Sequence, residues 1–298
     1  MSYKKNYNQQ EAKEKAIENS KRLHVTLKGG IEALLAEMKQ GKSERLLNYL
    51  KVASRFHNYS PNNQMLILIE SWLRGFDPVH VAGMHTWNDL GFHVKKGEKG
   101  IPIFAPMIIK EKDKETGAET GEVFTLFKVV YVWADCQVEP FEEGTKLPTF
   151  FSPIHGDATA LYNCLADVVR HDGIQLLEVE GGIGTAQGVS YGGKIQILKN
   201  ESTNMFLTLV HEYTHELLHQ RQKNDLSKQT KECHAEAVSY IVAHHFGIHN
   251  PFSSDYLQNW GNDEKSLQAE LEIVQETAAT IIDAMEATLQ PKQAETAA

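Results

Sequence analysis

Apolar residues recur at helical spacing through the first part of the chain, where good helix formers dominate residues 11–39. We expect a helix there that breaks at residues 29–30, a pair of glycines, because glycine is a poor helix former. A second helix is expected over about residues 43–57 and a third over residues 64–73, joined by the turn 59–63. The apolar face of the first helix consists of Leu27, Ile31, Leu34 and Leu35.

Short runs rich in β-formers replace the helical period after Val79. We expect strands from Val79, at residues 101–104 and at residues 124–133, with the charged stretch 111–122 as a hairpin loop. Residues 139–153 contain three prolines, paired glutamates and a glycine, a composition typical of a domain boundary. We therefore expect a first domain over residues 1–140, a linker over 141–153 and a second domain over 154–298.

The second half of the chain is mainly helical in its pattern. Its strand-loop-strand segment ends at residues 194–198, and the tail after Pro291 is expected to be disordered. The pattern thus predicts an α+β fold, with an N-terminal α+β domain followed by a mostly helical domain with a small sheet. The expected helices cover about residues 157–171, 203–222, 231–246 and 264–289.

Charge divides the 298-residue chain unevenly. The net charge is −9, of which residues 1–150 carry +2 and residues 151–298 carry −11. An asymmetry of this kind suggests two units with different partners. The polar start has no signal-peptide pattern, no run is long enough to span a bilayer, and the three cysteines are widely spaced. We therefore expect a cytoplasmic protein with reduced thiols and no membrane partner.

A metal-binding motif, His211-Glu212-Tyr-Thr-His215, follows an apolar run inside the helix expected over residues 203–222. Histidines at i and i+4 point the same way on a helix and can bind one Zn²⁺, or another divalent metal. The glutamate between them lies beside the coordinated water and can take its proton. The sequence therefore predicts a metal-dependent hydrolase, with His211 and His215 as ligands and Glu212 as the catalytic base.

Two features of this motif leave alternatives open. The motif occurs again in the overlapping register His215-Glu-Leu-Leu-His219, and we prefer the first register because it directly follows the apolar run. His219 would then support the site from outside or serve as an alternative ligand. The third ligand is expected from Glu232 or Glu236, which share a helix face. We favour Glu232 as the ligand and Glu236 as the residue that orients a histidine; Asp225 is a weaker candidate.

Candidate nucleic-acid contacts gather in the first 100 residues, around an amide-rich turn and a lysine- and glycine-rich turn. Amides can bind base edges, aromatic rings can stack on bases, and lysines can bind phosphates. On these residue types alone, a set of core aromatics beside a solvated basic loop is the favoured interpretation. The candidate contacts are Arg55, Asn58, Tyr59, Asn62, Asn63, Gln64, Trp87, Lys95, Lys96 and Lys99.

Three stretches resemble the N-terminal domain of the ArdC antirestriction family: Phe56-His-Asn-Tyr-Ser-Pro-Asn-Asn-Gln-Met-Leu-Ile67, Gly83-Met-His-Thr-Trp-Asn-Asp-Leu-Gly91 and Val94-Lys-Lys-Gly-Glu-Lys-Gly-Ile-Pro-Ile103. The resemblance extends from about Leu46 to Phe246. It implies an N-terminal domain that binds single-stranded DNA and a C-terminal zincin-like metallopeptidase domain. Where the family often has a Phe-Asp-x-x-Gln-Thr-like string, this chain reads Val132-Trp-Ala-Asp-Cys-Gln137.

Two functions compete on this basis. The first is an antirestriction protein of a mobile element that binds single-stranded DNA and carries a zinc-dependent metallopeptidase-like domain. The second is a regulatory metallopeptidase that cleaves a repressor or restriction subunit, with an N-terminal domain that recognises protein. A purely structural role for the metal is a third reading.

Overall fold

The computed structural model describes residues 2–41, 44–112, 119–147, 158–220, 225–250 and 263–289. The chain forms two compact units, of which the first comprises Met1–Glu32 and Asn62–Pro148 and the second Ala33–Pro61 and Thr149–Ala298. The change of unit near residue 148 falls in the proline-rich stretch that the sequence marks as a boundary. That Ala33–Pro61 belongs to the second unit was not predicted from the sequence.

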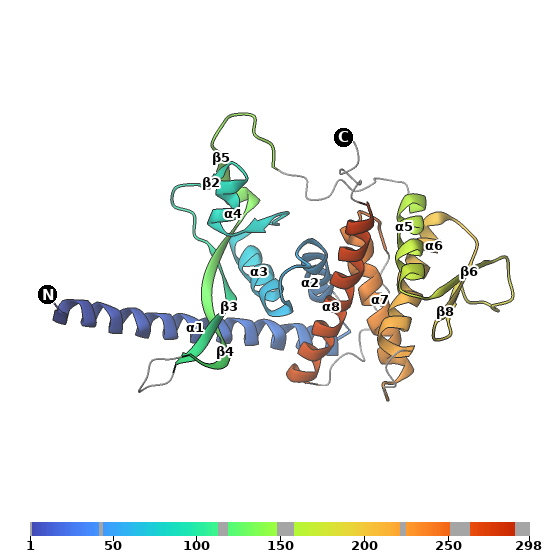
Figure 1. Ribbon diagram of the computed structural model, residues 1–298, viewed down its shortest axis with the longest axis horizontal. Helices are drawn as coiled ribbons and strands as arrows, with labels where there is room; N and C mark the ends of the chain where they lie inside the picture. Colours follow the sequence, from blue (N-terminus) through green and yellow to red (C-terminus); the bar gives the residue numbers. More distant parts are fainter. Residues whose placement is uncertain are drawn as a thin grey trace. The chain divides into compact units, whose positions relative to one another are not determined.

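The first unit combines helices with two small sheets (Figure 1). Strands β1, β4 and β3 form an antiparallel sheet in that order, and β2 pairs with β5. Helix α1 begins in this unit and ends in the second one. The elements are α1 (Ser2–Lys39), α3 (Pro61–Arg74), β1 (Val81–Ala82), α4 (Met84–Asp89), β2 (Phe92–Val94), β3 (Ile101–Lys112), β4 (Glu119–Ala134) and β5 (Val138–Pro140).

A small core around Trp87 holds the short elements of this unit together. Trp87 packs with Phe92 and Val138, and its indole N–H donates to the Trp133 carbonyl at 2.9 Å. Asn63 fixes α3 to β3, because its side chain both donates to and accepts from the Phe104 backbone, at 2.8 and 2.9 Å. Burial with satisfied polar groups makes both residues structural parts of the unit.

Strands β3 and β4 form a long two-stranded ribbon, which Figure 1 shows in green. Its register pairs Pro102 with Tyr131 and Pro106 with Phe127. Paired residues of an antiparallel ribbon share a face, so these four residues lie on the same side. Both rings are well exposed, Tyr131 at 47% and Phe127 at 63%.

Helices build most of the second unit, because each carries an apolar stripe that needs a partner. Helix α6 packs against α5 and α7, and α7 also packs against α2 and α8. Strand β8 lies between β6, to which it is parallel, and β7, to which it is antiparallel. The elements are α2 (Glu44–Arg55), α5 (Ala158–His171), β6 (Gln175–Val179), β7 (Gly188–Ser190), β8 (Lys194–Leu198), α6 (Ser202–His215), α7 (Lys228–His245) and α8 (Glu264–Leu289).

The predicted α+β class is confirmed, and several local predictions are corrected. Residues 29–30 do not break α1, and the short helix α4 and strand β5 were not predicted. Strands β3 and β4 run well beyond the predicted 101–104 and 124–133, because pairing with each other satisfies their backbones without burial. Residues 113–118 of the expected hairpin loop, most of the expected linker and the tail after Pro291 lie outside the described residues.

The end of the motif helix also differs from a regular α-helix. Residues Glu216–Gln220 form a π-helical turn directly after α6, and π-turns often occur at functional sites. All three cysteines are free, as the sequence indicated. Within the described ranges, every helix is too short or too polar to cross a bilayer.

Candidate metal centre and candidate nucleic-acid surface

Helices α6 and α7 bring the predicted metal ligands together. His211 and His215 lie one turn apart near the end of α6, and Glu232 lies on the second turn of α7. The apolar run before His211 is buried against neighbouring helices, with Phe206, Leu209 and Val210 fully enclosed. Burial of that face fixes the rotation of α6, and so directs both imidazoles toward α7.

The geometry of this cluster fits a divalent metal. The two Nε2 atoms are 3.1 Å apart, and the Glu232 Oε2 atom lies 3.3 Å from Nε2 of His211 and 3.8 Å from Nε2 of His215. One ligand atom from each residue thus falls within 4.8 Å of the others. Two histidines and one glutamate form a ligand set of catalytic zinc sites, which leave a further position for water.

Two more glutamates lie next to this cluster and contact different partners. Glu236, one turn after Glu232, places Oε1 at 3.5 Å from Nδ1 of His211, the position of a carboxylate that orients a ligand histidine. Glu212 is buried beside the ligands and accepts a hydrogen bond from the backbone N–H of Ser190 on β7. The close approach of β7 to α6 needs Gly188, because a Cβ there would lie 2.6 Å from Thr208 and 2.7 Å from the Glu212 side chain.

The two carboxyl groups nearest the histidines have pKa values shifted in opposite directions. Burial raises the pKa of Glu212, against the opposing effect of the two histidines. Hydrogen bonds from His211 and His215 hold the pKa of Glu232 far below its usual value. For His211 burial lowers the pKa, but the hydrogen bond to Glu232 and the charge of Glu236 outweigh it and raise the pKa overall. Glu212, whose pKa is raised, therefore lies beside Glu232, whose carboxylate stays ionised.

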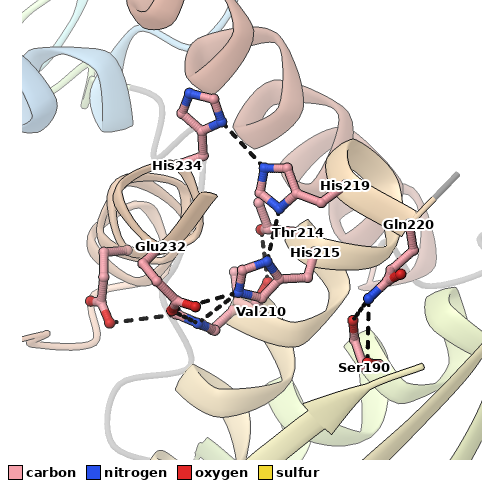
Figure 2. Close-up of polar contacts among 10 residues, drawn as sticks. Ser190, Val210, Thr214, His215, His219, Gln220, Glu232 and His234 are labelled. Carbon is pink, nitrogen blue, oxygen red and sulfur yellow. Dashed lines mark hydrogen bonds and ion pairs between the residues drawn. The ribbon is translucent and has the colours of Figure 1, made fainter. Parts of the chain in front are cut away.

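The structure distinguishes the two registers of the motif. Glu216, the glutamate of the second register, is fully buried and accepts hydrogen bonds from the backbone N–H groups of Gly192 and Gly193 at 2.9 and 2.7 Å. Its carboxylate thus supports the turn between β7 and β8. His219 contacts His215 through its Nδ1 atom, 2.8 Å from Nδ1 of that residue, on the side away from Glu232. Figure 2 shows His219 between His215 and His234.

Several of the predicted DNA contacts are buried in the structure. Asn63, Gln64 and Trp87 are 7%, 0% and 0% exposed, so their side chains cannot reach a nucleic acid in this conformation. We therefore remove these three from the candidate surface. Their sequence signal was misleading because aromatic and amide residues serve equally well in a hydrogen-bonded core.

The other predicted DNA contacts divide between the units. Arg55 and Asn58 are exposed and Tyr59 is half-buried, all in the second unit. In the first unit Asn62, Lys96 and Lys99 are exposed, whereas Lys95 is half-buried and donates to the Cys136 carbonyl at 2.9 Å. Arg74 and Gln137 hold the turn that carries the lysines by donating to the Lys99 carbonyl.

Sequence reasoning missed an aromatic surface beside this lysine turn. A Cβ on Gly100, which ends the turn, would lie 2.8 Å from Cβ of Tyr131, so the two are in direct contact. Tyr131 also lines a shallow cavity between the ribbon and helices α1 and α3. Only the spatial pairing of β3 with β4 brings these residues to one place. The cavity is lined by Asn19, Arg22, Leu23, Thr26, Glu70, Pro102, Val129 and Tyr131.

Comparison with known proteins finds one matching protein family and one similar protein. The N-terminal domain of anti-restriction factor ArdC matches residues 17–133. An uncharacterized protein of Bacillus anthracis is 24% identical over 297 residues, covering 85% of this chain and 49% of its own length. The chain therefore spans about half the length of this relative.

Two solved structures share the fold. The metal-free structure of the antirestriction protein ArdC from the R388 plasmid has a TM-score of 0.55 at 16% identity, and covers 88% of this chain and 97% of its own. The Mn(II)-bound structure of the same protein has a TM-score of 0.54 at 17% identity, with coverage of 90% and 99%. The resemblance found in the sequence is confirmed: residues 17–133 match the N-terminal domain of ArdC, in a chain with the fold of the ArdC antirestriction protein.

Proposed function

We propose that this chain is an antirestriction protein that binds single-stranded DNA with its first unit and carries a zinc-dependent metallopeptidase-like site in its second. The observation that carries the antirestriction role is the ArdC domain match over residues 17–133. The metal site rests on the convergence of His211, His215 and Glu232, with Glu212 alongside. An ArdC structure that holds Mn(II) supports a divalent ion in this fold.

The chemistry of the second unit is that of a metal-assisted hydrolase. A bound divalent ion supplies the Lewis acid that activates water for attack on a carbonyl. Glu212 would accept the proton of the activated water, and burial shifts its pKa upward, toward neutral pH. Strand β7 lies at the edge of its sheet beside Glu212, and an extended peptide would run along this edge past Ser190, whose backbone already bonds to Glu212 and to Gln220.

The DNA surface is proposed on the ribbon and the lysine turn of the first unit. Tyr131 and Phe127 offer exposed rings on one face, as a stacking platform for unpaired bases. Lys96 and Lys99 lie on the turn that contacts Tyr131 through Gly100, and can bind phosphates. Arg22 and its neighbours in the cavity beside Tyr131 can hydrogen-bond the edge of a stacked base.

The DNA part is tested by fluorescence anisotropy with a labelled single-stranded oligonucleotide, the full chain and a range of salt concentrations. We expect affinity to fall as salt rises, because phosphate contacts release counterions. The double variant Lys96→Gln/Lys99→Gln should reduce the slope of log affinity against log salt by about 1.4, since each contact to a single strand contributes about 0.7. Tyr131→Ala should weaken binding at least about fivefold, from loss of one stack worth about 1–3 kcal/mol.

Lys265→Gln, an exposed lysine on α8, is the matched control and should bind like the wild type. Absence of binding at about 50 mM salt, where phosphate contacts are strong, would remove the DNA role altogether. Wild-type binding that the ribbon variants leave unchanged would place the DNA elsewhere on the chain.

The second candidate, a regulatory peptidase, is favoured by the position of Glu212 between the ligands and β7. Glu212→Gln separates the peptidase function from the DNA-binding function, because the variant should keep metal and DNA binding while losing hydrolysis. Protection of incoming DNA against restriction is the readout in cells. Retained protection would show that binding is sufficient, whereas its loss would make hydrolysis the function.

A further inference from the structure

A chain of polar side chains, with two buried imidazoles in the middle, runs from His215 to helix α8. Nδ1 of His215 lies 2.8 Å from Nδ1 of His219, and Nε2 of His219 lies 3.3 Å from Nδ1 of His234. Nε2 of His234 then contacts the carboxylate of Glu270. His219 and His234 are 8% and 1% exposed, and their rings are stacked at 19°. Figure 2 shows the first three members in line.

One arrangement of protons satisfies this chain when His215 binds an ion. Binding through Nε2 requires a lone pair there, so the proton of neutral His215 is on Nδ1 and is donated to His219. His219 must then accept at Nδ1 and carry its own proton on Nε2, which it donates to His234. His234 in turn carries its proton on Nε2 and donates it to Glu270. Every link has one donor and one acceptor.

We propose that His219, His234 and Glu270 form a proton-ordered relay that holds the proton of His215 on Nδ1 and, through the polarised hydrogen bonds, makes its Nε2 atom a stronger metal ligand. The inference rests on the metal site of the proposed function. A carboxylate behind a ligand histidine fixes its tautomer and makes it a stronger ligand, and such partners typically change metal affinity about 10–100-fold. His211 receives this support directly from Glu236, whereas His215 receives it through two further imidazoles.

The relay also explains why these polar groups lie in the interior of the second unit. Buried imidazoles and carboxylates cost free energy unless each is hydrogen-bonded. In the relay, each side chain is hydrogen-bonded to the next one. It links the C-terminal helix α8 to the metal centre through α7, so α8 serves the site as well as the core.

The test measures affinity for Zn²⁺ and for Mn²⁺ in the full chain, by competition with a chelating dye. In Glu270→Gln the amide oxygen can still accept from His234, but the charge is gone, and we expect affinity to fall about tenfold. His234→Phe breaks the chain while filling its space, and affinity should fall further, toward about 100-fold. Glu272→Gln, an exposed carboxylate on the same helix, is the matched control and should bind like the wild type.

Two further measurements distinguish a relay from simple core packing. Unfolding of the metal-free proteins shows whether Glu270→Gln keeps the wild-type stability, so a loss of affinity without a loss of stability supports positioning. Nitrogen-15 NMR of the metal-loaded protein should show His219 and His234 protonated at Nε2.

The outcomes separate this inference from the proposed function. A wild-type protein that binds neither ion overturns the metal site and the relay together. A wild type that binds while Glu270→Gln binds equally well overturns the relay alone. His219 protonated at Nδ1 in the loaded protein would also overturn it.

Discussion

Two glutamates one turn apart show how single residues of the same type acquire different roles. Glu212 and Glu216 both follow a histidine of the motif and both are buried. Glu212 lies beside the candidate metal ligands, while Glu216 accepts two backbone hydrogen bonds from the turn at Gly192 and Gly193. Both glycines have positive φ, 79° and 86°, a conformation that other residues rarely adopt. The turn and the buried carboxylate therefore depend on each other.

This division predicts stability effects of very different size for the two matched amide variants. Glu216→Gln replaces one accepting oxygen by an amide donor that faces a backbone N–H, so it should destabilise the protein by about 2–3 kcal/mol. Glu212→Gln should cost little, because burial already disfavours the charge on that group. Urea unfolding of the metal-free proteins measures both. Equal stability of the two variants would contradict the assignment of Glu216 to the turn.

At the scale of elements, α1 shows that tertiary packing overrides a weak local signal. Gly29 and Gly30 predicted a break, but the helix continues through both. Gly30 lies against α3, where an added Cβ would come within 2.4 Å of Ile69 Cδ1, whereas nothing lies within 4 Å of such an atom at Gly29. A glycine in a helix costs about 1 kcal/mol, which packing against α3 can offset at one of the two positions.

We therefore predict that Gly29→Ala stabilises the protein by about 1 kcal/mol, as expected for an exposed helix position. Gly30→Ala should gain less or destabilise, because the Ile69 side chain must move. Thermal unfolding of the two variants checks the difference. A larger gain from Gly30→Ala would show that α1 and α3 are not packed this closely.

The strands of the first unit were only partly predictable. Apolar runs indicated the buried start of β3 and the buried end of β4, but the rest of the ribbon runs through exposed residues that the sequence pattern did not identify as strand. The sequence therefore did not indicate that its exposed aromatic rings lie together on one face. The short helix α4 was missed because six residues carry too little periodicity to be recognised.

At the scale of the whole molecule, buried histidines predict a dependence of stability on pH. The pKa of His244 is lowered to about 4, by burial and by the nearby positive charges of His249, Lys51 and Arg55. Below its ordinary pKa of 6.5 the unfolded chain binds a proton that the folded protein resists. The His244 contribution to stability is therefore lost as pH falls from 6.5 toward 4.

The variant His244→Gln has no imidazole to protonate, so it should lose less stability than the wild type when the pH falls from 7 to 5. The expected difference is at most about 1 kcal/mol, since the imidazole is partly accessible to solvent. Chemical denaturation at the two pH values measures it. His85→Gln, on the exposed side of α4, is the control, and an identical pH dependence in all three proteins would refute the prediction.

The sequence by itself determined the features that depend on local spacing. Histidines four residues apart lie on one helix face, as do Glu232 and Glu236, so the candidate ligands could be named without a fold. The ArdC resemblance likewise followed from short strings of residues, and the domain match confirms it.

Only the tertiary structure decided which helix faces pack against each other and which side chains meet there. It placed Glu232 toward the Nε2 atoms and Glu236 toward Nδ1 of His211, because the packing of α7 on α6 sets their rotation. It enclosed Trp87 and Gln64, joined Ala33–Pro61 to the second unit, and aligned His219 and His234 with Glu270. Burial and long-range hydrogen bonding depend on residues far apart in the chain, and local spacing carries no information about them.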